Sequence, residues 1–285
     1  MREKPPEFRP LTRDEIERLL PPVNARAEAE AQARKSQEDG FCDLCREGNG
    51  MVLLQDESGK KALKPCQNPE CVAAQKMRIW KRALGSYGSA YSHYTLESLL
   101  TDQNLSLMQA KKAVAQFCLK WPYEVEGKGL IFTGSYGLGK THLALAAMRK
   151  LIVEKDVKQA VYVNERRFFQ EIRDSYSDDA TVTESALLRR MFSAKVLVLD
   201  ELGTQKPTEW AQNKLADIID TRMGMAEQVT FITTNLAMQA EGENSLGERI
   251  GILCYSRISA MCVHYHIAGE DYRQGPGRAT GSLLQ

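Results

Sequence analysis

The chain has 285 residues, a formal net charge of +1 and seven cysteines, and 26% of its residues are charged. This length fits one large domain, or one medium domain with attachments. No apolar run approaches the roughly 20 residues that span a bilayer, and the charged, proline-rich start lacks the apolar stretch of a secretory signal. We therefore expect a cytoplasmic protein without a membrane partner, in which local patches rather than net charge decide any binding of nucleic acid.

Residues 1–41 are predicted to form a polar, helix-prone arm. Thr12 and Glu15 have the spacing of a capping box, and the prolines at 21–22 end that short helix. The stretch 24–39 is rich in helix formers but has no apolar stripe. A solvated helix and a partner-binding arm both fit this pattern.

Residues 42–71 hold four of the seven cysteines: Cys42, Cys45, Cys66 and Cys71. In a cytosolic chain such a cluster favours metal over disulfides. The C-x2-C pair brings two thiolates to one side of Zn²⁺, and the second, looser pair completes a tetrahedron. Between the pairs the sequence reads as a β-hairpin with a turn at "DESGKK". We expect a structural zinc module, because four thiolates leave no open position for catalysis. The other three cysteines lie in apolar surroundings and are predicted to be packing residues.

Residues 72–92 are predicted to form a basic linker helix followed by a hinge rich in Gly, Ser and Tyr. The helix has no acidic residue, and its apolar positions recur at helical spacing. Its basic residues are Lys76, Arg78, Lys81 and Arg82, and its apolar ones are Met77, Trp80 and Leu84. Packing through Trp80 and contact with nucleic acid remain equally open.

Residues 93–273 have the composition of an α/β domain, and 274–285 read as a flexible tail. Five short apolar runs alternate with helical patterns, which indicates a parallel sheet buried on both faces. The expected strands are 129–133, 160–164, 196–200, 229–233 and 261–267.

A glycine-rich loop follows the first of these strands and opens a helix, which is the setting of a phosphate-binding loop. Its pattern is Gly134-x4-Gly139-Lys140-Thr141. Backbone N–H groups and the helix N-terminus would hold the phosphates of ATP. Lys140 would contact the β- and γ-phosphates, and Thr141 would bind Mg²⁺. The predicted nucleotide-binding set is Gly134, Ser135, Tyr136, Gly137, Leu138, Gly139, Lys140, Thr141 and His142.

Polar residues follow two further strands at the edge where ligands of parallel sheets gather. Asp200 ends the strand "VLVLD" and is expected to hold Mg²⁺, whereas Glu201 would polarise the attacking water. Asn235, with Thr234 beside it, follows "VTFIT". If the strand before the loop is central in the sheet, the first and fourth strands are neighbours, and Asn235 would reach the γ-phosphate or the water.

This arrangement resembles AAA+ ATPases, and over most of residues 90–273 it looks like the DnaC/DnaI-type helicase loaders and their IstB-type transposition relatives. "HYTLESLL" (93–100) resembles the segment that leads into their adenine pocket. The resemblance implies an arginine finger, donated to a neighbouring subunit, at Arg257, with Arg249 as the alternative. It places the sensor-2 arginine at Arg273, and it implies a sheet domain without a C-terminal lid.

The resemblance also implies DNA contacts. Helicase loaders line a pore with the helix after the second strand and the loop after the Asp-Glu pair. The matching positions are Arg173, Tyr176, Thr208 and Trp210. Phosphate neutralisation and base stacking would suit single-stranded DNA. Tyr176 and Trp210 could equally be core residues, and Phe168 and Phe169 are expected to be.

Our leading hypothesis is an ATPase that assembles around single-stranded DNA and loads a hexameric replicative helicase, with the zinc module resembling the helicase-contacting domain of the DnaI-type loaders. An IstB-type ATPase that recruits a transposase to duplex DNA is the alternative. A zinc-containing RecA-like motor fits less well, because Glu201 directly follows Asp200. A nucleotide clamp without hydrolysis would require a defective site.

Overall fold

The computed structural model describes residues 8–10, 51–56, 61–101, 104–125, 129–205, 208–225, 227–242 and 244–272. The chain divides into two compact units, Met1–Arg78 and Ile79–Gln285. Among the described residues, no helix has the length and apolar character needed to cross a membrane.

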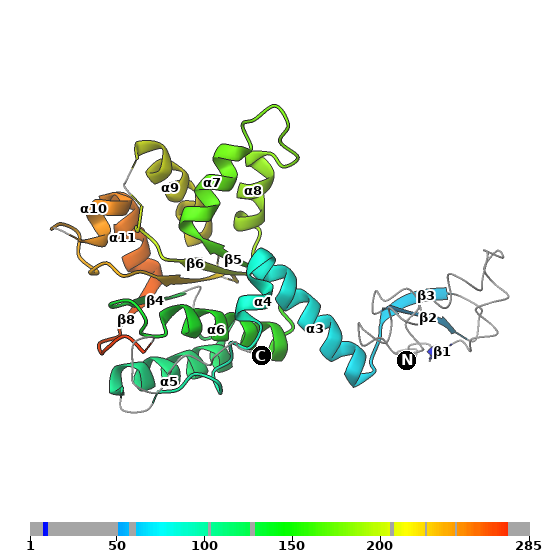
Figure 1. The fold of residues 1–285 in the computed structure, drawn as a ribbon. Coiled ribbons are helices and arrows are strands. Elements are labelled where there is room, and N and C mark those ends of the chain that lie inside the picture. The colour runs from blue at the N-terminus through cyan, green and yellow to red at the C-terminus, as the bar shows by residue number, and fades with distance from the viewer. Residues whose placement is uncertain are drawn as a thin grey trace, which may run out of the picture. The chain divides into compact units, whose positions relative to one another are not determined.

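The first unit contains a small antiparallel sheet (Figure 1). Strands β2 (Met51–Asp56) and β3 (Lys61–Pro65) pair along their length, which confirms the expected hairpin between the cysteine pairs. Strand β1 (Phe8–Pro10) pairs with β2 on its other side. Strand β1 was not predicted, because three residues are too few for a periodic pattern. The helices expected elsewhere in 1–41 lie outside the described residues.

Helix α3 (Pro69–Leu84) begins near the second cysteine pair. A proline at the first helical position suits it, because that N–H has no partner within a helix. In the second unit Trp80 is completely buried, and the Arg149 guanidinium lies 5.7 Å from the centre of its ring. The packing interpretation of Trp80 is therefore confirmed. A 3₁₀ turn, η2 (Gly85–Tyr87), and the short helix α4 (Gly88–Tyr91) follow.

The second unit is built on a five-stranded parallel sheet of order β5-β6-β7-β4-β8. All five expected strands are present within one residue of their predicted ends. They are β4 (Gly129–Thr133), β5 (Ala160–Asn164), β6 (Val196–Asp200), β7 (Val229–Thr233) and β8 (Cys262–His266). The predicted adjacency of β4 and β7 is confirmed. The central place belongs to β7, however, because β8 is the only strand beyond β4.

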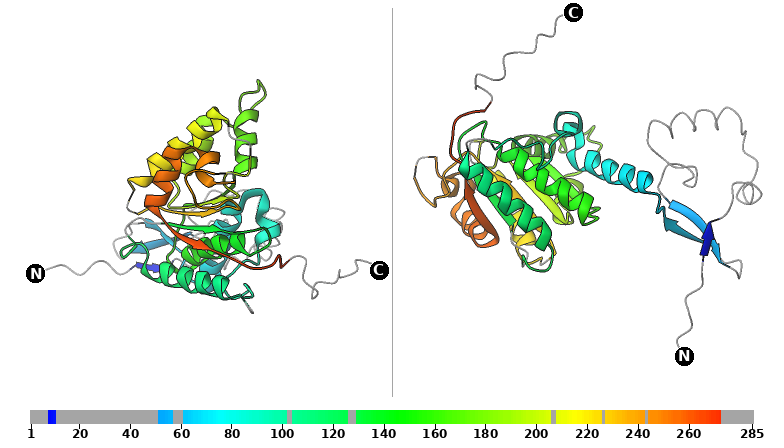
Figure 2. Two further views of the ribbon diagram at one scale, coloured as in Figure 1. Left: turned by 90° about the vertical axis from the view of Figure 1, so that its left-hand side faces the viewer. Right: turned by 90° about the horizontal axis from the view of Figure 1, so that it is seen from below.

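Helices cover both faces of this sheet, as Figure 1 shows. One face carries α5 (Leu105–Lys120) and α6 (Lys140–Glu154), which lie side by side in the right-hand view of Figure 2. The other face carries α7 (Glu165–Asp174), α8 (Glu184–Phe192), α9 (Glu209–Met223), α10 (Leu246–Ile250) and α11 (Ile252–Met261). All residues of β4, β6 and β7 are buried, and burial on both faces explains why these strands are mostly apolar.

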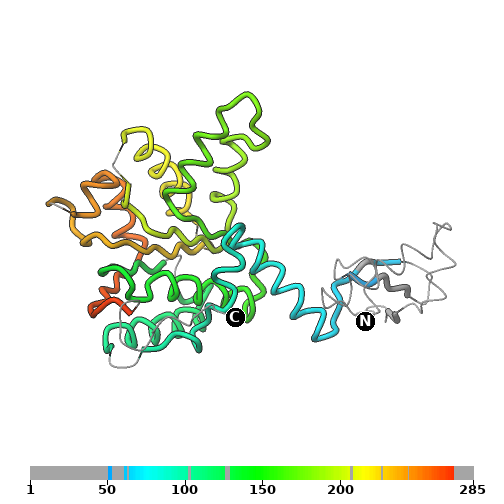
Figure 3. The backbone as a smooth tube through the Cα atoms, viewed as in Figure 1, coloured from blue at the N-terminus to red at the C-terminus, as the bar shows by residue number. Residues whose placement is uncertain are grey.

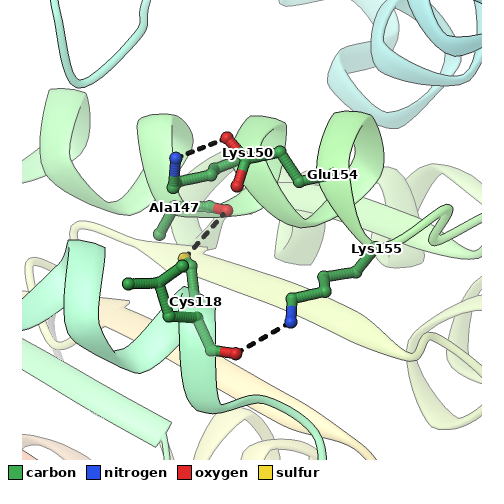
Figure 4. A network of polar contacts seen from close by, with 6 residues as sticks. Cys118, Ala147, Lys150, Glu154 and Lys155 are labelled. Atoms are coloured by element: carbon green, nitrogen blue, oxygen red, sulfur yellow. Dashed lines mark hydrogen bonds and ion pairs between the residues drawn. The ribbon is translucent and has the colours of Figure 1, made fainter.

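Polar contacts tie α5 to α6 and to the turn that follows it (Figure 4). The Cys118 thiol donates to the Ala147 carbonyl at 3.7 Å, and the Lys155 ammonium donates to the Leu119 carbonyl at 2.8 Å. Burial raises the pKa of Cys118 to about 12, so this thiol stays protonated. Cys254 and Cys262 are also buried, which confirms all three as packing residues.

Candidate nucleotide-binding site

The predicted phosphate-binding loop connects β4 to α6, and Figure 3 follows the backbone through it. Three of its glycines have positive φ angles: 135° at Gly134, 72° at Gly137 and 82° at Gly139. A side chain at Gly137 would collide with the Asp271 carboxylate, and one at Gly134 would collide with the Ile267 carbonyl. The loop therefore requires glycine for conformation and for close approach.

Lys140 and Thr141 occupy the first turn of α6, where backbone N–H groups point outward. The Lys140 ammonium is 7% exposed and donates to the Ser135 carbonyl of the same loop at 2.5 Å. The cation is thus held over the loop, at the position from which it can neutralise a bound phosphate. The backbone N–H groups, the Lys140 ammonium and the glycines of the loop together fit the phosphates of a nucleoside triphosphate.

Asp200 ends β6 and accepts three hydroxyl hydrogen bonds. Thr141 and Thr233 donate to Oδ1 at 2.8 and 2.6 Å, and Tyr162 donates to Oδ2 at 2.8 Å. Burial raises the pKa of Asp200, and the three hydroxyl donors oppose that shift. A carboxylate beside a threonine hydroxyl is the oxygen donor set that Mg²⁺ takes near substrate phosphates. The residues present therefore fit the ion.

Glu201 has a left-handed backbone, with φ of 58°, which is rare outside glycine. Its N–H donates to the Thr233 hydroxyl at 2.9 Å, and its Oε2 accepts from the Asn164 amide at 2.9 Å. Residues held in such conformations concentrate at functional sites. The Glu201 side chain is exposed whereas Asp200 is buried, and the two follow each other at the carboxyl edge of the sheet.

Tyr162, Asn164 and Thr233 were missed by the sequence analysis although each lies in a predicted strand. A signal existed for Asn164, because it ends β5 in register with Asp200 at the end of β6. Parallel strands bring their carboxyl ends together. Strand order, which the sequence does not specify, was needed to use that signal.

Thr234 and Asn235 follow β7 at the same edge. Thr234 is completely buried, and its hydroxyl donates to the Leu202 carbonyl at 2.7 Å and accepts from the Leu236 N–H at 3.1 Å. This hydroxyl therefore braces the loop after Glu201 instead of facing a ligand. Asn235 is half-buried, and its contact with the γ-phosphate remains a prediction.

The segment 93–100 packs against the start of α6, as expected for a nucleotide-site neighbour. The Tyr94 ring stacks on His142 with centres 4.2 Å apart, and the Thr95 carbonyl lies 2.8 Å from His142 Nε2. Burial lowers the pKa of His142, so the imidazole is neutral at pH 7. Leu99 lies close to Gly139 of the loop.

The three candidate arginines differ in their surroundings. Arg257 on α11 forms an ion pair with Asp220 of α9, and its side chain is 33% exposed. Arg249 on α10 donates to the Gln205 carbonyl at 3.4 Å, just beyond Glu201. Arg273 lies outside the described residues, but the neighbouring Tyr272 N–H donates to the Gly137 carbonyl at 3.3 Å.

Two of the predicted DNA-binding residues, Tyr176 and Trp210, differ in their burial. The Tyr176 hydroxyl donates to Glu184 at 2.6 Å. Tyr176 is 56% exposed. The indole of Trp210 meets the buried Phe169 ring edge-on, with centres 5.6 Å apart. Trp210 therefore belongs partly to the core, whereas Tyr176 belongs to the surface.

Arg173 and Thr208 flank this pair. Arg173 is exposed on α7 and donates to Gln170 at 2.9 Å. The Thr208 hydroxyl accepts the Ala211 N–H at 3.2 Å as the cap of α9, which is a structural role. Phe168 and Phe169 are 5% and 3% exposed, which confirms them as core.

Glu165, also missed from the sequence, holds the loop after Glu201. Its buried carboxylate accepts the Gly203 N–H at 3.0 Å. Burial nonetheless raises its pKa to about 7. The loop that carries Glu201 into α9 is therefore fixed by the first residue of α7.

This raised pKa predicts a pH-dependent stability. Between pH 4.5 and about 7 the folded state binds the Glu165 proton more tightly than the unfolded chain, so that contribution is complete below pH 4.5 and lost above about pH 7. We expect the free energy of unfolding to fall by about 2–3 kcal/mol more in the wild type than in Glu165→Gln between pH 5 and 8. All three tryptophans lie in the second unit, so tryptophan fluorescence during urea unfolding measures this unit alone. Identical pH profiles would contradict the assignment.

Of the four clustered cysteines, Cys66 and Cys71 are described. They are 3% and 0% exposed; Cys66 directly follows β3, and Cys71 lies in the first turn of α3. The described residues include no group of three or more potential metal ligands. Cys42 and Cys45 lie outside them.

Comparison with known proteins places this geometry in a family. The model of the IstB-like ATP-binding proteins matches residues 92–278. The replicative helicase loader DnaI of Bacillus subtilis is 29% identical over 173 residues, which cover 59% of this chain and 54% of that protein. The loader DnaC of Buchnera aphidicola is 30% identical over 120 residues, covering 42% and 47%.

Among solved structures, a DnaC helicase loader superimposes with a TM-score of 0.52 at 27% identity, covering 63% of this chain and 99% of that one. The chain spans about half the length of the curated relatives it matches. The family model nevertheless covers well over half of the chain, and its region contains the loop, Asp200 and Glu201. The chain belongs to the family of IstB-like ATP-binding proteins, which includes relatives of the DnaC/DnaI type.

Proposed function

We propose that this protein is an ATP-dependent loader that places a hexameric replicative helicase on single-stranded DNA. The observation that carries the proposal is the convergence of Lys140, Thr141, Asp200 and Glu201 at one sheet edge. Relatives named as replicative helicase loaders support the biological role.

Each residue of the site has a defined part in hydrolysis. The loop and Lys140 bind the triphosphate, and Thr141 and Asp200 hold Mg²⁺, which neutralises charge on the β- and γ-oxygens. Glu201 orients and polarises the attacking water, with Asn164 positioning its carboxylate. Asn235 contacts the γ-phosphate or that water, and Arg273 acts as sensor 2.

An arginine from a second copy completes the site. Arg257 is the first candidate, since breaking its ion pair with Asp220 would free a guanidinium for a neighbour's phosphate. Arg249 is the alternative finger. Its contact with the loop after Glu201 supports a role within its own subunit, which is why it ranks second. Hydrolysis would thus depend on self-assembly into an oligomer.

Single-stranded DNA would bind across α7 and the start of α9. Arg173 supplies charge, and Tyr176 and the exposed part of Trp210 supply stacking surfaces. Thr208 is the weakest member of this set, because its hydroxyl caps α9. The direct contacts of Glu165 and Asn164 with the Glu201 loop join this surface to the nucleotide site.

The first unit would be a zinc module that holds the helicase. Support comes from the buried thiols of Cys66 and Cys71 at the base of the confirmed hairpin. Val52 of β2 is buried as well. Metal would organise this small unit, with Cys42 and Cys45 as the remaining ligands.

The second candidate is an IstB-type ATPase that remodels duplex DNA and recruits a transposase, which the matching family model favours. Binding experiments separate the two. A loader retains a replicative helicase in an ATP-dependent manner and binds single strands more tightly than duplex. Preference for duplex, with no helicase retained, would favour the transposition role.

A further inference from the structure

Tyr162 contacts Asp200, the carboxylate that is expected to hold Mg²⁺. It is 5% exposed on β5, and its hydroxyl donates to Asp200 Oδ2 at 2.8 Å. The other carboxylate oxygen, Oδ1, accepts from Thr141 and Thr233. The three donors hold the carboxylate at both ends, and only Tyr162 fixes the oxygen remote from Thr141.

A second tyrosine holds the first. Tyr91, the last residue of α4, packs its ring edge-on against the Tyr162 ring, with the two ring centres 5.7 Å apart. Tyr87 also meets the Tyr162 ring edge-on, at 5.2 Å.

Tyr87 and Tyr91 belong to the joining segment, residues 85–91, which follows α3 and precedes the sheet domain. Their rings stack 5.7 Å apart. A displacement of this segment therefore moves the two rings that pack against Tyr162. The Tyr162 hydroxyl in turn bonds Asp200, which also accepts from Thr141.

We propose that Tyr162 is a positioning residue that orients Asp200 for Mg²⁺, and that Tyr91 couples the joining segment to that metal site. The inference rests on the proposed function, since it assumes that Asp200 holds the ion of a bound nucleotide. It assigns the joining segment a regulatory role: the position of α4 sets the affinity for Mg²⁺ and leaves the phosphate-binding loop untouched.

The test uses the full chain and a fluorescent ATP analogue, with binding measured in EDTA and then during a Mg²⁺ titration. For Tyr162→Phe we expect affinity in EDTA within about twofold of the wild type, and a half-saturating Mg²⁺ concentration about three- to tenfold higher, because a bond to a charged group is lost. Tyr91→Ala, which removes the ring that packs against Tyr162, should shift the same curve about twofold in the same direction. Tyr265→Phe, a half-buried tyrosine on β8, is the matched control and should not shift it.

The outcomes distinguish a failure of the roles given to Tyr162 and Tyr91 from a failure of the proposed function. A Mg²⁺ curve for Tyr162→Phe that coincides with the wild type overturns the positioning role. A shift in Tyr162→Phe with none in Tyr91→Ala overturns the coupling to the joining segment. If the wild type itself binds nucleotide without any dependence on Mg²⁺, the proposed function fails instead. Tyr91 is only half-buried, so Tyr91→Ala still tests the coupling if Tyr162→Phe folds poorly.

Discussion

Replacing Arg257 with alanine is expected to lower kcat for ATP by a factor on the order of 10³ or more, while each protomer still binds ATP. The reason is that charge accumulates on the transferring phosphoryl group only during hydrolysis, so a finger acts on the rate and not on binding. Steady-state hydrolysis at protein concentrations that allow assembly measures the effect.

Mixing two inactive variants tests whether the finger acts between copies. Lys140→Ala cannot bind the triphosphate but keeps Arg257, and Arg257→Ala keeps the site but lacks the finger. Their mixture should recover part of the wild-type activity. Asp220→Asn is the matched control, since it breaks the ion pair of Arg257 and leaves the arginine in place. Full activity of Arg257→Ala alone, with loss in Arg249→Ala, would transfer the role to Arg249.

Removing zinc from the first unit should have the second large effect. Metal binding contributes about 10–16 kcal/mol to small modules of this kind, which is enough to decide whether they fold. We expect one zinc per purified chain, and none in Cys71→Ser. That variant should lose protease resistance within 1–78 and should no longer retain the helicase.

The second unit should keep its own activity in that variant, because its sheet, loop and Asp200 contain no cysteine ligand. Cys118→Ala, which changes a buried thiol between α5 and α6, serves as the control and should retain zinc. Purified protein without zinc that still shows a protected N-terminal unit would disprove the metal module.

The strands and the loop between β4 and α6 could be predicted from the sequence, because each depends on a local pattern of residues. The strands are continuous β-branched runs, and the loop needs glycine at fixed offsets. The carboxyl-edge positions of Asp200 and Glu201 followed from the same strands. These features require no knowledge of how distant segments meet.

Contacts that depend on strand order were not predictable in this way. Tyr162, Asn164 and Glu165 reach Asp200 and the Glu201 loop only because β5 pairs with β6. Thr233 was overlooked in favour of Thr234, because alternation along β7 decides which hydroxyl faces Asp200 and which faces Leu202. The expected central position of β4 failed for the same reason, since apolar runs do not encode the order of strands.

The central claim is that Glu201 activates water for hydrolysis of an ATP held by Lys140 and Asp200. The most direct measurement is single-turnover hydrolysis of bound ATP by Glu201→Gln, with Glu124→Gln, an exposed carboxylate after α5, as the control. The account predicts that Glu201→Gln binds ATP normally and hydrolyses it about 10²–10⁴ times more slowly. Hydrolysis at the wild-type rate by Glu201→Gln would contradict it.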